Sequence, residues 1–400
     1  MKLWQPSLPK EYASLDAETL HRRIADRKAE LANDLVILGH HYQQDEVVRH
    51  ADFTGDSFKL SQLAAETVEQ VGARYVVFCG VHFMAESADI LTPPNTAVIL
   101  PDLSAGCSMA DMAAEDEVTD AWDQIHAVLE DEGFEGRVVP ITYMNSSAAI
   151  KAFVGEHGGA VCTSSNARAI LQWAFAGGVR PRDDGETIKL LFLPDQHLGR
   201  NTAADMGYLP PTDMTLWDPR APEGLGGNQP EDLLQRDVIL WKGHCSVHKL
   251  FRPEHVDEAR AAQPDIRVIV HPECDRAVVE RADMTGSTEA IIRAVEQAEP
   301  GSHWAVGTEV HLVQRLARQA AERGVHVRIL SDCQCLCTTM YRIDPQHLLW
   351  VLDELADGRV VNQISVDQKT RRFSLVALER MLSITGADAP TNPAHADAAT

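Results

Sequence analysis

The chain has 400 residues, of which 44% are hydrophobic and 24% charged, and its formal charge is −23. This length is enough for two to four domains with ample core, and the composition is ordinary for a globular protein. The acidic charge argues against nucleic acid or an anionic membrane as a partner, and no apolar run approaches the ~18–20 residues of a membrane-spanning helix.

The first residues lack the apolar core of a signal peptide, which favours a cytoplasmic, reducing location. In such a compartment cysteines rarely form structural disulfides. We therefore expect the eight cysteines to act as thiols or metal ligands.

A charged helix is predicted over Thr19–Asn33, and a regular α/β pattern follows it. The first strand is expected in Leu35–Tyr42, with His40, His41 and Tyr42 at its carboxyl end. An amphipathic helix, the strand YVVFCG, a second helix and the strand AVILPD come next. This alternation predicts a small parallel sheet with right-handed crossovers. Ligands of such sheets bind beyond the carboxyl ends of the strands.

The same pattern occurs three times. Its first strands are predicted in Leu35–Tyr42, Val138–Asn145 and Ile266–Glu273. Each copy has a turn rich in hydroxyl groups (GDS, TSS and GST), and each ends at a cysteine: Cys107, Cys245 or the CQCLC segment. From Ser57 to Cys107 and from Ser287 to Cys337 the spacing is 50 residues in both cases. We predict an α/β protein of three similar α/β/α domains with pseudo-threefold symmetry, which would bring three thiolates together.

The predicted domain boundaries follow from these repeats. The three repeats are expected over residues 1–115, 116–255 and 256–345, with closing helices in 346–385 and a disordered tail in 386–400. The second repeat is longer, since Ser164 and Cys245 are 81 residues apart. Its surplus, around 201–237, is rich in proline and glycine, and we interpret it as a long surface loop or lid.

Three thiolates with one vacant position are typical of a reactive iron–sulfur site. A fully ligated [4Fe–4S] cluster takes four thiolates, so three ligands leave one iron open as a Lewis acid. A lone cysteine is more often a small buried hydrophobic residue, which is the favoured interpretation of Cys79, Cys162 and Cys274. The CQCLC thiols, Cys333, Cys335 and Cys337, could instead form a redox-labile disulfide or bind zinc.

Polar side chains gather at the ends of the three equivalent strands: His40, His41, Tyr42, Tyr143, Asn145, His271 and Glu273. Buried strand ends seldom collect such residues unless something polar binds there. As a set they predict a binding cavity, although each alone could be structural. Glu273, beside His271, is a candidate general base.

Hydroxyl residues precede the helix of each repeat: Ser57, Ser164, Ser287 and Thr288. They could simply cap the helices. A helix N-terminus is also an anion site, and together with Lys242 or Lys249 it would supply positive potential for an anionic substrate in an acidic chain. The sequence has no GxGxxG or Walker loop, so we expect no nucleotide cofactor.

Together these motifs resemble those of quinolinate synthase. The matching motifs are GHHYQ, ADFTGDS, PDLSAGCSMAD, YMNSSAAIKA, CTSSNA, GHCSVH, HPECD and MTGST, and they span about residues 34–339. The resemblance implies three α/β/α domains about a pseudo-threefold axis and a [4Fe–4S] cofactor. It also implies condensation of iminoaspartate with dihydroxyacetone phosphate to quinolinate for NAD synthesis, with L-aspartate oxidase as a candidate partner.

Site residues carried over by motif follow from this resemblance. The cluster ligands would be Cys107, Cys245 and Cys337, the last because Met340 follows it in CTTM, although Thr338 stands where the family often has proline. Glu273, Tyr42 and His271 would be catalytic. The substrate-binding residues would be His40, Ser57, Tyr143, Met144, Asn145, Ser164, His248, Pro272, Ser287 and Thr288.

Two other functions stay open at this point. One is a hydro-lyase that uses the same type of cluster on another hydroxy-acid, which only a substrate assay would separate. The other is a non-catalytic redox- or metal-sensing protein that uses the CQCLC thiols and would tolerate His271→Ala and Glu273→Ala.

Overall fold

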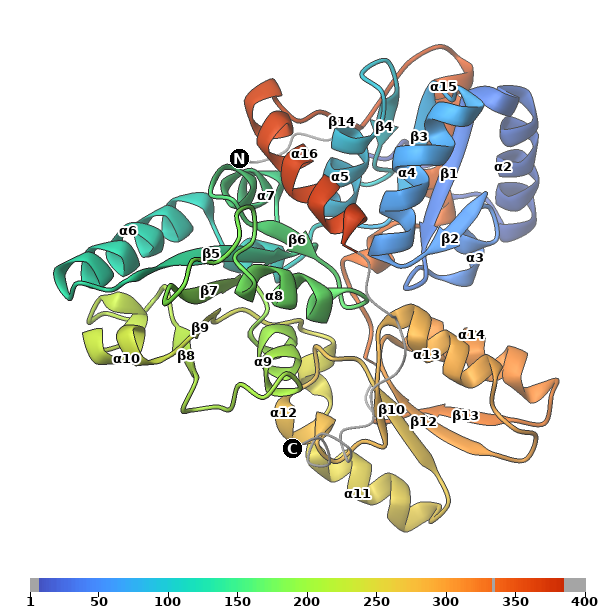
Figure 1. Cartoon of the computed structure of the whole chain (residues 1–400). Coiled ribbons are helices and arrows are strands. Elements are labelled where there is room, and N and C mark those ends of the chain that lie inside the picture. Colours follow the sequence, from blue (N-terminus) through green and yellow to red (C-terminus); the bar gives the residue numbers. More distant parts are fainter. Residues whose placement is uncertain (1–6, 333–334, 385–400) are drawn as a thin grey trace. The chain divides into compact units, whose positions relative to one another are not determined.

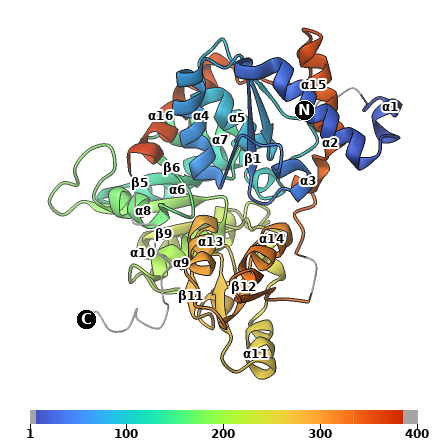
Figure 2. The same ribbon diagram turned by 90° about the vertical axis from the view of Figure 1, so that its right-hand side faces the viewer.

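The computed structural model describes residues 7–332 and 335–384 (Figures 1 and 2). Cys333 and the predicted C-terminal tail lie outside these ranges. The chain divides into two compact units: unit 1 comprises residues 1–107, 309–315 and 336–368, and unit 2 comprises residues 108–308, 316–335 and 369–400.

Unit 1 is built on a five-stranded sheet. Its strands, in spatial order, are β14 (Gln363–Ile364), β4 (Ala97–Ile99), β3 (Tyr75–Cys79), β1 (Leu35–His40) and β2 (Phe53–Gly55). Only β14 runs antiparallel to its neighbour. Every residue of β1 is buried, which explains its uninterrupted apolar sequence.

Helices cover both faces of this sheet. They are α1 (Lys10–Ala13), α2 (Ala17–Leu31), α3 (Asp45–Val48), α4 (Ser57–Val71), α5 (His82–Leu91) and α15 (Pro345–Ala356), with 3₁₀ turns η1 (Ala32–Asp34) and η5 (Met340–Arg342). In Figure 2, α4 and α5 lie on one side of the sheet and α2 and α15 on the other. Asp353 on α15 accepts hydrogen bonds from Tyr12, Arg23 and Arg27, and so joins α1 and α2 to α15.

Unit 2 contains a second five-stranded sheet, which is wholly parallel. Its order is β6 (Ala160–Cys162), β5 (Gly136–Tyr143), β7 (Thr187–Leu193), β9 (Val238–Trp241) and β8 (Met214–Trp217). The accompanying helices are η2 (Ala110–Met112), α6 (Glu115–Asp131), α7 (Ala148–Glu156), α8 (Ala167–Phe175), α9 (Gln196–Ala204), η3 (Leu225–Gly227), α10 (Pro230–Gln235), η4 (His248–Leu250) and α16 (Gln368–Ser383).

The interpretation of residues 201–237 as a long surface loop or lid is wrong. The segment contains the edge strand β8 and the helix α10. Asn228 organises it, since its side-chain amide donates to the carbonyls of Leu216 and Leu225 at 3.0 and 2.9 Å. Gly226, at φ +59°, packs so closely that a Cβ would lie 2.5 Å from the Trp217 ring. The glycine that signalled a loop therefore permits close packing.

A third sheet, also parallel, lies in unit 2. Its order is β11 (Met284–Thr285), β10 (Arg267–Val270), β12 (His303–Gly307) and β13 (His326–Ile329). Its helices are α11 (Pro253–Ala262), α12 (Arg276–Val279), α13 (Thr288–Glu296) and α14 (Val310–Ala321), of which residues 310–315 belong to unit 1. Figure 1 shows α13 on one side of this sheet and α11 on the other.

The three sheets confirm the α/β class and the threefold repetition seen in the sequence. The domain boundaries and the pseudo-threefold axis stay predictions. The two closing helices join different units, because α16 contacts α7 of unit 2: Ser374 Oγ donates to the Ala148 carbonyl at 2.7 Å. In the part of the chain that the structure describes, no helix is both long and apolar enough to cross a membrane.

Candidate functional site

Burial separates the cysteines into two groups. Seven lie in the described ranges, none of them in a disulfide. Cys79, Cys162, Cys274 and Cys335 are buried, whereas Cys107, Cys245 and Cys337 are partly exposed. Burial raises the pKa of the Cys79 thiol to about 12, so it stays protonated. The three partly exposed cysteines are the three predicted cluster ligands, and the burial of Cys335 favours Cys337 within the CQCLC segment.

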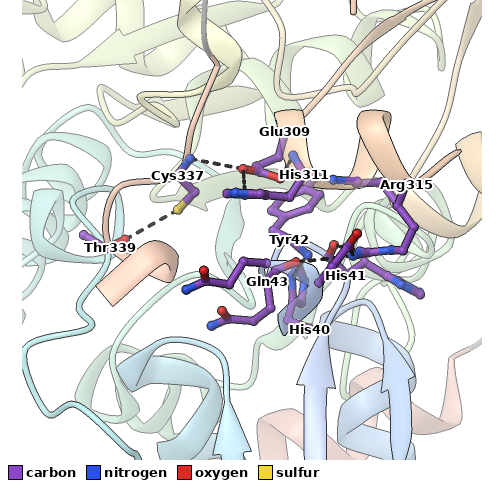
Figure 3. A network of polar contacts seen from close by, with 12 residues as sticks. His40, His41, Tyr42, Gln43, Glu309, His311, Arg315, Cys337 and Thr339 are labelled. Atoms are coloured by element: carbon purple, nitrogen blue, oxygen red, sulfur yellow. Dashed lines mark hydrogen bonds and ion pairs between the residues drawn. The ribbon is translucent and has the colours of Figure 1, made fainter. Parts of the chain in front are cut away.

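In unit 1, the residues after β1 form a tight turn (Figure 3). The amide of Tyr42 donates to His40 Nδ1 at 3.1 Å, and the amide of Gln43 donates to the His40 carbonyl at 3.0 Å. The rings of His40 and Tyr42 meet edge to face, with centroids 4.8 Å apart. The turn therefore fixes two of the predicted site residues against each other.

Arg315 on α14 holds this turn in place by hydrogen bonds to its backbone carbonyls. Its guanidinium donates to the carbonyls of His41 and Gln43, the latter at 3.3 Å, and pairs with Asp45 at 2.7 Å. One planar fork thus holds the backbone on both sides of Tyr42. Nothing in the sequence analysis singled out Arg315.

The two cysteine loops of unit 1 are also linked. The Cys337 amide donates to the buried Glu309 carboxylate at 3.4 Å, and Cys337 Sγ lies 3.5 Å from Thr339 Oγ1. Arg342, five residues after Cys337, reaches Asp102 at 3.3 Å and Ser104 at 2.5 Å, just before Cys107. Unit 1 therefore holds the segments of two predicted ligands beside one another.

In unit 2, Cys245, His248 and Glu273 converge. One potential ligand atom from each lies within 4.8 Å of the others. His248 Nδ1 donates to Glu273 at 2.8 Å, and His248 Nε2 contacts Thr308 Oγ1 at 3.1 Å. The rings of His248 and His271 stack with centroids 4.5 Å apart. The structure thus brings together four of the predicted residues from the β9 and β10 ends.

Burial and hydrogen bonding determine the protonation of His271 and Glu273 in this group of residues. Burial lowers the pKa of His271 to about 3, so its imidazole is neutral at pH 7. Burial alone would raise the pKa of Glu273, but the neighbouring His248 and hydrogen bonds from His248 and Tyr143 outweigh it and lower this pKa. Glu273 is therefore a carboxylate at neutral pH, which can accept a proton.

The turn after β10 repeats the turn after β1. The amide of Glu273 donates to His271 Nδ1 at 3.3 Å, and the amide of Cys274 donates to the His271 carbonyl at 3.0 Å. Asn201 on α9 clamps it, because its Nδ2 donates to the carbonyls of Pro272 and Cys274, both at 2.8 Å. Sequence reasoning missed Asn201, which was assigned to the supposed loop.

Known proteins resemble this chain over almost its whole length. The family model described as "Quinolinate synthetase A protein" matches residues 22–383. A quinolinate synthase of Acidobacterium capsulatum is 56% identical over 376 residues, which cover 94% of this chain and 95% of the relative. Those of Rhodopirellula baltica and Corynebacterium glutamicum are each 51% identical, and the matches cover 94% and 97% of this chain and 93% of each relative.

The chain belongs to the quinolinate synthetase A family. It is therefore an enzyme.

The turn after β5 supplies the third set of predicted residues. Tyr143 and Met144 are buried there, and the Met144 amide donates to the Cys162 carbonyl at 2.7 Å. Asn145 Oδ1 is buried with no hydrogen-bond partner in the described ranges. Gln43 of unit 1 is fully buried. Neither its Nε2 nor its Oε1 has a hydrogen-bond partner in the described ranges. Because an unsatisfied buried amide costs ~1–3 kcal/mol, both carboxamides point to a polar ligand, and sequence reasoning missed Gln43.

The hydroxyl residues divide between capping and other roles. Ser287 caps α13 by accepting the Ala290 amide at 3.2 Å, and the adjacent Thr288 is buried. Asp56, rather than Ser57, caps α4 by accepting the Lys59 amide at 2.9 Å. Ser164 lies before α8, whose cap is Asn166. The simple capping interpretation therefore holds for Ser287 but not for Ser57 or Ser164.

Proposed function

We propose that this enzyme condenses iminoaspartate with dihydroxyacetone phosphate to form quinolinate, with release of phosphate and two waters. The observation that carries the proposal is the grouping of the partly exposed Cys245 with the buried His248 and Glu273 in a chain of the quinolinate synthetase A family. The product would feed NAD synthesis. We place the reaction in the cytoplasm, with L-aspartate oxidase as the source of iminoaspartate.

A [4Fe–4S] cluster held by Cys107, Cys245 and Cys337 is part of this proposal. These three are the partly exposed cysteines of the described ranges, and thiolates are the ligands that such clusters require. When bound with one iron open, the cluster supplies a Lewis acid for a substrate oxygen.

Proton transfer in this proposal falls to Glu273 and Tyr42. His248 donates to the Glu273 carboxylate and keeps it ionised, so Glu273 can take a proton from a substrate carbon or nitrogen. His271, neutral and stacked on His248, orients this pair. Because its Nδ1 accepts the Glu273 amide, its Nε2 carries the proton and can donate one hydrogen bond. Tyr42 is held against His40, which orients its hydroxyl for proton exchange during isomerisation and ring closure.

Substrate binding is assigned to the remaining predicted residues. These are His40, Ser57, Tyr143, Met144, Asn145, Ser164, His248, Pro272, Ser287 and Thr288. The amides at the start of α13, next to Thr288, favour a phosphate or carboxylate. The buried side-chain oxygen of Asn145, which has no hydrogen-bond partner in the described ranges, suits a substrate amine or hydroxyl.

The test is anaerobic purification and cluster reconstitution, followed by iron analysis, a visible spectrum and a quinolinate assay. We expect about four irons per chain and quinolinate formation in the wild type. Cys107→Ala, Cys245→Ala and Cys337→Ala should lose both, whereas the buried Cys335→Ala serves as the matched control and should keep both. Iron-free protein after reconstitution would refute the cluster. A loaded cluster without quinolinate formation would favour a hydro-lyase for another hydroxy-acid.

A further inference from the structure

Helices α9 and α14 are each capped at the N-terminus by a buried acidic side chain. Asp195 accepts hydrogen bonds from the amides of His197 and Leu198 at 2.7 and 2.8 Å. Glu309 accepts from the amides of His311 and Leu312 at 2.8 and 3.3 Å. Both carboxylates are completely buried, and both lie two residues beyond the end of a central strand, β7 or β12.

Each carboxylate also reaches the loop that carries a proposed cluster ligand. The Cys337 amide donates to Glu309 at 3.4 Å within unit 1 (Figure 3). Within unit 2, Asp195 forms a β-bridge with Gly243, and the next amide, that of Gln196, donates to the Gly243 carbonyl at 3.0 Å. Burial raises the pKa of Asp195, and the backbone amide of Cys245, two residues farther along this loop, is one of the groups that oppose this rise. Two separate units thus repeat the same connection.

Helix capping alone does not explain these carboxylates. Burying an ionisable group is costly, and a hydroxyl can cap a helix without that cost. Ser147 and Ser287 cap α7 and α13 in this way. In the first repeat, Val81 occupies the corresponding position before α5, and the His82 amide instead donates directly to the Ala105 carbonyl beside Cys107. The carboxylate is present where a side chain must bridge the helix to the cysteine loop.

We propose that Asp195 and Glu309 are positioning residues for the metal cluster, which fix the backbone amides of Cys245 and Cys337 and hence the direction of their sulfur atoms. This inference rests on the cluster of the proposed function. Ligand-orienting partners of this kind typically change metal retention ten- to hundred-fold when removed.

The decisive variants are Asp195→Ser and Glu309→Ser. Serine can still cap α9 or α14, but its side chain is too short to reach the cysteine loop. Asp195→Asn and Glu309→Gln keep an acceptor oxygen in place and test rescue. Asp344→Ala is the matched control, because Asp344 caps α15 by accepting the His347 amide at 2.8 Å and belongs to neither bridge.

The measurement is cluster retention by the full chain after anaerobic reconstitution. Iron and sulfide per folded chain are determined, and the visible absorbance is followed after addition of an iron chelator. We expect the serine variants to lose the cluster about ten- to hundred-fold faster than the wild type, and the amide variants and Asp344→Ala to stay within about twofold of it.

Different outcomes would overturn different claims. Serine variants that fold and retain the cluster as long as Asp344→Ala would refute the positioning role. If the serine variants do not fold, rapid loss from Asp195→Asn and Glu309→Gln, as fast as from Cys337→Ala, would also refute it, because those variants keep the hydrogen-bond acceptor. A wild-type chain that takes up no cluster would refute the proposed function instead.

Discussion

The turns after β1 and β10 share a backbone but differ in the side chain that they present. Each turn begins with a histidine that accepts two hydrogen bonds. Its Nδ1 accepts one from the amide two residues later, and its carbonyl accepts one from the amide three residues later. Counting the histidine as the first residue, the carbonyls of the second and fourth residues accept hydrogen bonds from one side chain, which is Arg315 in unit 1 and Asn201 in unit 2. The third residue, held between the clamped carbonyls, is Tyr42 in one turn and Glu273 in the other. A repeated scaffold thus supports different chemistry.

The difference between the two clamps follows from charge. Arg315 has Asp45 as a counter-ion, so its positive charge is compensated beside the neutral Tyr42. In unit 2 the turn itself carries the Glu273 carboxylate. A cationic clamp there would pair with Glu273 and reduce its ability to accept a proton, and it would add another buried charge. The neutral amide of Asn201 donates the same two hydrogen bonds without either effect.

The largest difference between the turns should appear in catalysis. Glu273→Gln keeps the size of the side chain but removes the proton acceptor, and should lower kcat by about 10²–10⁴-fold. Tyr42→Phe removes one hydroxyl and should lower kcat by about tenfold or somewhat more. The measurement is the rate of quinolinate formation at matched cluster content, and equal losses in the two variants would contradict the division of roles.

The clamp of unit 2 comes next in expected size. Asn201→Ala leaves two buried carbonyls without donors, at a cost of about 1–3 kcal/mol each, and Asn201→Asp should be worse because it places a carboxylate against them. Both should lower the free energy of unfolding in denaturant titrations and reduce kcat more than they change KM. Asn95→Ala, at an exposed turn, is the matched control. An unchanged stability in Asn201→Asp would show that the clamp is dispensable.

The clamp of unit 1 should tolerate change better. Arg315→Lys keeps a positive charge near Asp45 but loses the planar fork, so only part of the two carbonyl contacts can survive. We expect a loss of about 1–2 kcal/mol in the free energy of unfolding, and a larger loss in Arg315→Met. The exposed Arg22→Lys should have no effect. If Arg315→Met matches wild type, Tyr42 must be held by other contacts.

The sequence was informative where a physical pattern repeats. Buried parallel strands need continuous apolar runs, so β1, β5 and β10 could be predicted, with their observed ends within a few residues of those expected. Equal spacing in the first and third repeats led to Cys107 and Cys337, and the matching place of Cys245 in the longer second repeat added the third cysteine; this ligand set stays a prediction. Burial then separated Cys337 from Cys335, which spacing within CQCLC could not do.

The missed residues act on backbone groups, which leave no pattern in the sequence. Arg315 and Asn201 bind carbonyls of segments remote along the chain. Gln43 is notable only because its side chain is buried and has no hydrogen-bond partner among the described residues. One signal was nevertheless present. Asn201 follows the buried Asp195 by six residues, and Arg315 follows the buried Glu309 by the same interval. Aligning the residues that follow β7 in the second repeat with those that follow β12 in the third would have found both pairs.

The smallest expected effect concerns a histidine of unit 1 beyond the β1 turn. Burial lowers the pKa of His50 to about 4, and its Nε2 lies 2.8 Å from His21 Nδ1. An unfolded histidine has a pKa of about 6.5, so between that pH and about 4 the unfolded chain binds more protons. Stability from the neutral His50 is therefore present above pH ~6.5 and is lost as the pH falls.

His50→Gln should reduce this loss between pH 7 and pH 5 by about 1 kcal/mol, since the site is only partly shielded from water. Gln can still hydrogen bond with His21, so the comparison isolates the proton. Urea unfolding at both pH values measures the difference. Because His50 lies outside the β1 turn, quinolinate formation at pH 7 should be unaffected. A pH dependence identical to that of wild type would instead place the acid sensitivity in unit 2, where burial also lowers the pKa of His197 to about 4.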